Sequence, residues 1–78
     1  MNTDKLNCFL AIADEGSFSA AARRLFITQT AVSLQMTSLE KEIGCTLFLR
    51  GSSGVSLTPE GRALIPLARE VMRAQQRL

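Results

Sequence analysis

Apolar side chains recur with helical spacing through most of the chain. In the segments 4–15, 18–25 and 29–43 they follow one another at intervals of three or four residues, which places them on one face of an α-helix. The apolar positions are Leu6, Phe9, Leu10 and Ala13 in the first segment, Phe18, Ala21, Ala22 and Leu25 in the second, and Val32, Met36, Leu39 and Ile43 in the third. The pattern predicts three amphipathic helices that pack around a common core.

Residues that favour helix ends stand at the boundaries of these segments. The expected N-caps are Asn2 or Thr3, Ser17 and Thr28, and Gly16 is placed to end the first helix. Ile27 and Val32 occupy the positions of a hydrophobic staple around the Thr28 cap. Because only residues 26–28 separate the second helix from the third, these two helices form a candidate helix-turn-helix.

The period of the apolar pattern shortens to two residues after the third helix. "TLFLR" and "VSLT" are short strand candidates around a four-residue "GSSG" loop, and together they predict a β-hairpin. Thr58 and Pro59 then suit an N-cap and a first helical position. A last helix is expected from Pro59 toward Leu78, with a kink at Pro66, near residues 62–66, but no break.

The expected order is therefore helix, helix, helix, hairpin, helix. The fold class is mainly α with a short β-hairpin, which is a winged helix-turn-helix of three helices and a two-stranded wing, followed by a C-terminal helix. Residues 1–58 would form the winged domain and residues 59–78 the start of a linker helix. A chain of 78 residues with 46% hydrophobic content fits one small folded domain.

Composition removes several classes of function. The chain has no His and only two cysteines, Cys8 and Cys45, so neither a metal site nor a cofactor is expected, and the thiols are interpreted as buried or half-buried. No nucleophile motif is present, and an enzyme is not expected. No apolar run approaches the ~20 residues of a membrane span and no signal-peptide layout is present, which favours a cytoplasmic protein without membrane contact.

Charge is distributed unevenly along the chain. Residues 1–16 carry a net charge of −2, whereas residues 17–39 and residues 51–78 each carry +2. The whole chain has a net charge of +2. This distribution is compatible with a polyanionic partner without requiring one.

The stretch "GSFSAAARRLFITQTAVSLQMTSLEKEIGCTLFLR" resembles the N-terminal domain of LysR-type transcriptional regulators. The matching features are Phe9, Gly16-Ser17-Phe18, Ala21-Ala22, Leu25, the run Gln29 to Ser33, Leu39-Glu40, Gly44, Leu47-Phe48, Arg50, Leu57-Thr58 and Glu60-Gly61-Arg62. The resemblance implies sequence-specific binding of double-stranded DNA in bacterial transcription, at imperfect inverted repeats. It also implies a homodimer formed through the linker helix, and an effector ligand bound by a larger domain that this chain lacks.

The third helix, residues 29–43, is then the expected recognition helix in the major groove, with the wing, residues 47–58, on the backbone or minor groove. Short polar side chains would let the helix approach base edges, and Gln29 has the amide that pairs with adenine. The candidate DNA-binding residues are Ser17, Ser19, Thr28, Gln29, Thr30, Ser33, Leu34, Gln35, Thr37, Arg50, Ser52 and Ser53. Glu40 is expected to be a structural acceptor, and Arg23 and Arg24 to be solvated or distant phosphate neighbours.

Two positions depart from the family pattern. Leu34 stands where the family often has a basic or polar residue, and it either packs on thymine methyl groups or is a single exposed leucine. The wing loop, Gly51 to Gly54, lacks the family's second basic residue, which leaves Arg50 as the only cation of the hairpin. Arg50 is either a phosphate contact or a surface cation at a strand end.

The last helix carries a heptad-like seam that predicts a dimer interface. The candidate interface residues are Leu64, Ala68, Val71, Met72, Gln75 and Leu78. Ile65 and Met72 form an adjacent row, and one row is expected to pack on the first helix while the other faces outward. A second class of function remains open, a winged-helix module for protein–protein contact, which the small number of cations favours slightly and the hydroxyl-rich helix face disfavours.

Overall fold

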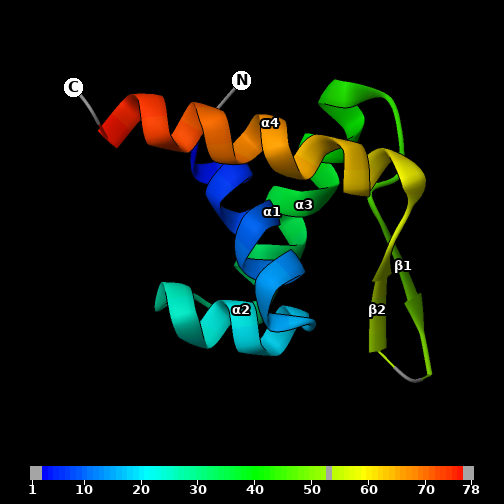
Figure 1. The fold of residues 1–78 in the computed structure, drawn as a ribbon. Coiled ribbons are helices and arrows are strands. Elements are labelled where there is room, and N and C mark those ends of the chain that lie inside the picture. Colours follow the sequence, from blue (N-terminus) through cyan, green and yellow to red (C-terminus); the bar gives the residue numbers. More distant parts are fainter. Residues whose placement is uncertain (1–2, 53, 77–78) are drawn as a thin grey trace.

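The computed structural model describes residues 3–52 and 54–76. The elements are α1 (Thr3–Glu15), α2 (Phe18–Leu25), α3 (Gln29–Ile43), β1 (Phe48–Gly51), β2 (Gly54–Leu57) and α4 (Pro59–Gln76). Their order is the predicted one. In Figure 1, α1 lies between α2 and α4, and the hairpin extends from one end of the helical body.

The predicted caps shape the turn between α2 and α3. The Ser17 hydroxyl accepts a hydrogen bond from the Ala20 N–H at 3.0 Å, and the Thr28 hydroxyl accepts one from the Ala31 N–H at 3.0 Å. The residue after α2 is Phe26, which adopts a left-handed conformation (φ 58°) that bulky side chains rarely take. The caps fix where α3 begins, and the left-handed residue turns the chain sharply enough for α3 to cross α2. Asn2, the alternative cap of α1, lies outside the described residues.

The core is built around α1, which packs against α2, α3 and α4. Phe9 and Ile12 are completely buried, and Ala21 on α2 is buried as well. Small side chains on α2 allow close contact between helices, and each large buried apolar side chain contributes about 1.5–3 kcal/mol. The buried side of α3 consists of Val32, Met36 and Leu39, so the core dictates which face of α3 remains outside.

The hairpin is tighter than the sequence suggested. Its register pairs Gly51 with Gly54 and Phe48 with Leu57, so the two glycines of the predicted loop belong to the strands. Strand β2 ends at Leu57, one residue before the predicted end, and Thr58 caps α4 as predicted. Its hydroxyl donates to the Thr46 carbonyl at 2.6 Å and accepts from the Gly61 N–H at 3.0 Å.

The start of α4 is pressed against the segment before β1. A Cβ atom on Gly61 would lie 2.3 Å from the carbonyl oxygen of Leu47, so only glycine fits at this position. The helix continues through Pro66, as predicted. Further along, α4 packs on α1, so the described part of the predicted linker segment shares the core of the winged domain. None of the described helices is both long and apolar enough to cross a membrane.

Candidate nucleic-acid interface

The outer face of α3 carries short polar side chains and one bare leucine. Thr30 and Thr37 are exposed, and between them Leu34 is 66% exposed. Because α3 buries the opposite face, this strip points into solvent along the length of the helix. The sequence prediction of a hydroxyl-rich face with Leu34 outside the apolar stripe is therefore confirmed.

The two edges of α3 face different parts of the molecule. At one edge, the Arg50 guanidinium donates to the Ser33 hydroxyl at 3.3 Å, which joins the wing to α3. At the other edge, Gln35 is half-buried beside α1. It lines a cleft of about 210 Å³ with Asp4, Asn7, Cys8, Leu25 and Ile27. Two residues subtend about 200° on an α-helix, so Ser33 and Gln35 cannot lie at the same edge.

Four predicted residues surround one shallow depression between the wing and the helix-turn-helix. Its volume is about 200 Å³, and it is lined by Ser17, Phe18, Ser19, Gln29, Arg50, Gly51, Gly54 and Val55. The N-terminal ends of α2 and α3 and the turn-side half of the hairpin meet there. The fold therefore brings Ser17, Ser19, Gln29 and Arg50 together from three separate stretches of sequence.

Arg50 is held in place and is not a free surface cation. Its guanidinium carbon lies 3.8 Å from the centroid of the Phe18 ring. Phe18 in turn meets the ring of Phe48 edge-on, with the centroids 6.0 Å apart. Sequence reasoning assigned Phe18 to the core and did not predict this contact, although Phe48 and Arg50 stand two residues apart on a strand and must share a face.

Several predicted site residues already have local partners. The Ser17 and Thr28 hydroxyls serve as caps, and the Ser17 and Ser19 oxygens lie 3.5 Å apart. Ser52 is exposed at the wing, and Ser53 lies outside the described residues. Glu40 accepts from the backbone N–H groups of Leu47 at 2.7 Å and Phe48 at 3.3 Å, which confirms it as a structural acceptor that positions β1.

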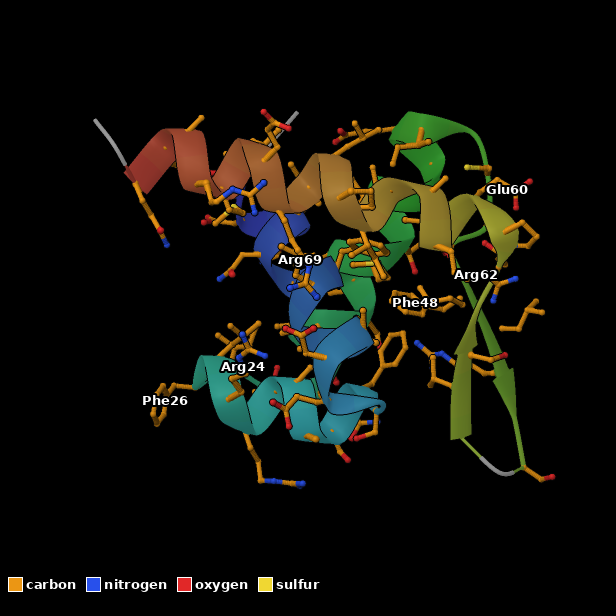
Figure 2. The ribbon with its side chains drawn as sticks, viewed as in Figure 1. Arg24, Phe26, Phe48, Glu60, Arg62 and Arg69 are labelled. Atoms are coloured by element: carbon orange, nitrogen blue, oxygen red, sulfur yellow. The ribbon has the colours of Figure 1, made fainter. Side chains whose placement is uncertain are left out.

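Most ion pairs lie away from the outer face of α3. Arg24 contacts Asp14 at 3.3 Å and Glu15 at 3.4 Å, and Arg69 contacts Asp14 at 3.1 Å. Figure 2 shows Arg24 on α2 and Arg69 on α4, both extending toward α1. These pairs neutralise the acidic end of α1.

One further ion pair ties α3 to the start of α1. Lys5 donates to Glu42, and this hydrogen bond lowers the pKa of the Glu42 carboxyl. The pair lies at the C-terminal end of α3, away from Gln29 and Ser33. Arg50 is thus the cation that the structure places at the edge of the candidate interface.

Both cysteines are free thiols. Cys8 is buried, which raises its pKa to about 11, and its sulfur lies 3.9 Å from the Val32 carbonyl oxygen. Cys45 is half-buried. Within residues 3–52 and 54–76, no group of three or more His, Cys, Asp or Glu side chains is arranged to hold a metal ion.

The family of this chain is shown by its match to a protein-family model. Residues 3–62 match the model described as "Bacterial regulatory helix-turn-helix protein, lysR family". The chain belongs to the lysR family. The resemblance inferred from the sequence is confirmed. The winged helix-turn-helix fold is confirmed as well, because the structure matches that of the CbnR DNA-binding domain.

That lysR-family structure, the CbnR DBD–DNA complex, matches with a TM-score of 0.95 and 35% identity, covering 99% of this chain and 88% of that chain. An uncharacterised HTH-type transcriptional regulator of Azotobacter vinelandii is 44% identical over 92% of this chain and 50% of its own length. The HTH-type transcriptional regulator TfdS of Cupriavidus pinatubonensis is 44% identical over 92% of this chain and 24% of its own length. The chain thus spans between a quarter and a half of these lysR-family regulators.

In this lysR-family chain, the faces of α4 differ from the predicted seam. Ala68 is 1% exposed, because it packs in the core of its own subunit, so it is not part of the outward face of α4. Leu64 and Met72 are half-buried and pack partly against the same core. The outward apolar side chains are Val71 at 42% exposure and Leu67, which was not predicted, at 63%. Gln75 is exposed, and Leu78 lies outside the described residues.

Proposed function

We propose that this chain is the DNA-binding part of a bacterial LysR-type regulator and that it recognises a specific sequence in double-stranded DNA. In this proposal α3 enters the major groove and the wing contacts the backbone or minor groove. The observation that carries it is the outer face of α3, a strip of short polar side chains with a cation held at one edge. A crystal structure of the similar CbnR DNA-binding domain in complex with DNA supports the proposed DNA binding.

The dimensions and chemistry of α3 suit a DNA groove. The major groove of B-DNA is about 12 Å wide and accepts an α-helix whose outer side chains do not obstruct it. Thr30 and Thr37 are short enough for close approach, and each hydroxyl both donates and accepts hydrogen bonds. Gln29, in the first turn of α3, presents an amide that matches the N6 and N7 edge of adenine.

The predicted contacts fall into two groups. Ser17, Ser19, Arg50 and Ser52 surround the wing side of α3 and are proposed to contact phosphates, which fix orientation and carry no sequence information. Gln29, Thr30, Leu34 and Thr37 are proposed to face base edges. Gln35 lies at the far edge of α3, so its proposed contact is with the backbone that flanks the groove.

We also propose that two copies associate through α4. Leu67 and Val71 stand one helical turn apart on its outward face, and exposed apolar rows of this kind usually mark a partner. A two-fold dimer would match an inverted repeat, since each subunit would bind one half-site. An effector ligand, expected from the family resemblance, would be bound by residues outside these 78. The proposal assigns no catalytic activity, and it places the protein in the cytoplasm with the DNA.

Selection from a pool of random duplexes, read by sequencing the bound fraction, tests the function directly. The expected result is an enriched motif with two related half-sites. Affinity for that motif is expected to fall as salt rises, with a shallow slope that corresponds to a few phosphates per subunit. An Arg50→Ala variant is expected to flatten the slope by about one unit. If no sequence is enriched and the amount of bound DNA does not depend on salt, the proposal is refuted and a protein-binding module is favoured.

A further inference from the structure

The wing of this chain depends on a single cation. Within residues 47–58, Arg50 is the only Lys or Arg, and serines and glycines follow it at the tip. A flexible Arg side chain samples many rotamers in solution, and those rotamers are lost when it binds a fixed phosphate. If the single cation of a wing is already oriented, less side-chain entropy is lost on binding and the affinity for phosphate is higher.

The hairpin turns Arg50 toward the body of the domain. Side chains alternate between the two faces of a strand, so Phe48 and Arg50 share one face of β1 and Leu49 lies on the other. Phe48 is 7% exposed whereas Leu49 is 57% exposed, which identifies the Phe48 face as the inner one. Figure 2 shows the Phe48 side chain pointing from the hairpin into the helical body.

A cluster of three aromatic rings, in tilted and edge-on contact, supports the guanidinium. Phe9 in the core lies 5.4 Å from Phe48, and Phe48 lies 6.0 Å from Phe18, centroid to centroid. Phe18 is 6% exposed, and Arg50 covers it at 3.8 Å. A cation within about 6 Å of a ring centroid is attracted by the electron density of the ring face. The ring that carries Arg50 is thus immobilised by the core itself.

A hydrogen bond to α3 fixes the remaining freedom of the side chain. One terminal nitrogen of Arg50 donates to the Ser33 hydroxyl at 3.3 Å. A guanidinium has five N–H donors, and this contact uses one of them. The face toward Phe18 and the edge toward Ser33 are occupied, and among residues 3–52 and 54–76 no acceptor takes the other donors, which are available to an anion.

From this geometry we propose that Phe18 and Ser33 are positioning residues, which hold the Arg50 guanidinium oriented toward a DNA phosphate before DNA arrives. The inference rests on the proposed DNA binding. It assigns Phe18 a role beyond its place in the core, and it makes Ser33 primarily a partner of Arg50. It also links the wing to the recognition helix, because the same guanidinium contacts both.

The arrangement in the free protein is tested by NMR without DNA. The side-chain protons of Arg50 are expected to resonate upfield of those of other arginines, since they lie over the Phe18 ring. Phe18→Leu is expected to abolish this shift, and Phe18→Tyr to retain it. An unshifted Arg50 in the parent chain would overturn the proposal, and this result does not depend on whether any variant folds.

The effect on binding is tested by a double-mutant cycle with a fluorescein-labelled duplex of mixed sequence. Phe18→Leu is expected to weaken binding about two- to fivefold, the range typical of an exposed cation–π contact. Combined with Arg50→Ala, it is expected to cause no further loss, because there is no guanidinium left to position. An equal loss in both backgrounds would overturn the proposal.

Matched variants separate positioning from general damage. Ile12→Val changes a fully buried core residue and alters none of the three rings, and it is expected to lower stability but to leave DNA affinity unchanged while the chain is folded. Ser33→Ala, like Phe18→Leu, is expected to weaken DNA binding only while Arg50 is present. An equal loss of affinity in the Arg50→Ala background would contradict the positioning role of Ser33. If the parent chain fails to bind DNA yet shows the shifted Arg50 signals, the proposed function is wrong and the geometry stands.

Discussion

The outer faces of α3 and α4 expose opposite kinds of surface. On α3 the exposed strip is formed by hydroxyl groups around a single leucine, Leu34, whereas on α4 it includes Leu67 and Val71 one turn apart. Both helices bury their other side in the same core. A short polar strip suits the base edges of a groove, while paired large apolar residues suit a protein surface. One small domain thus presents two surfaces suited to different partners.

Gly61 lies where the start of α4 contacts the segment that follows α3. Its substitution is expected to have the largest effect on the stability of the fold. In Gly61→Ala the new methyl group would overlap the Leu47 carbonyl, which is backbone and cannot move aside. We expect a loss of about 3 kcal/mol in the free energy of unfolding, the upper end for overpacking, measured by urea denaturation. Gly51→Ala is the matched control, because its Cβ would meet nothing closer than 3.9 Å. Equal stability of the two variants would contradict the close contact.

Val71→Glu is expected to weaken association through α4 without affecting the α3 surface. A carboxylate in the outward apolar row should weaken self-association at least about tenfold, because burying an unpaired charge in an interface is costly. Sedimentation of parent and variant, with and without an inverted-repeat duplex, measures the effect. Binding of one subunit to an isolated half-site should be unchanged, and Arg73→Glu on the exposed side of the same helix controls for charge. Dimerisation of Val71→Glu equal to the parent would exclude this face as the interface.

Leu34→Ala is expected to act on the α3 surface alone and by less. If Leu34 packs on a thymine methyl group, the variant loses about 1 kcal/mol of preference for thymine at one position and keeps its oligomeric state. The measurement compares duplexes with thymine or uracil at each position of the selected site. Where parent and variant discriminate thymine from uracil equally, Leu34 is a solitary exposed leucine and reads no base.

The smallest expected effect is a difference in reactivity between the two thiols, one of which lies beside α3 and the other beside α4. Cys8 lies beneath α3 with its pKa raised from 9.0 to about 11. Cys45 lines a shallow apolar cleft between the end of α3 and the start of α4, together with Ile43 and Leu67. Cys45 is therefore expected to react with iodoacetamide at neutral pH well before Cys8 does.

The raised pKa also has a consequence for stability. The folded state keeps the Cys8 proton that the unfolded chain loses near pH 9.0, so this contribution is complete below pH 9 and is lost as pH rises toward about 11. Urea denaturation across this range should show a steeper fall in the parent than in Cys8→Ala. Parallel curves, or faster labelling of Cys8, would contradict its burial.

Local patterns in the sequence determined the helices, their caps and the class of fold. Ser17, Thr28 and Thr58 each cap the helix that was predicted to follow them, because a cap acts within three residues of itself. The buried side of α3 was also predicted correctly, because the spacing of apolar residues within one helix is a local property of the sequence. The role of Glu40 as a structural acceptor was also inferred correctly, since a carboxylate beside a phosphate would be repelled.

Contacts between residues distant in sequence were decided by the tertiary structure. A 3.6-residue period specifies a helix and an apolar stripe, but two adjacent rows on α4 satisfied it, and only packing on α1 showed that Ala68 faces inward and Leu67 outward. The stacking of Arg50 on Phe18 joins residues that no local period relates. It exists because the register of the hairpin brings Arg50 over Phe18, while the packing of α2 on α1 holds Phe18 against Phe48, and these are properties of the assembled core.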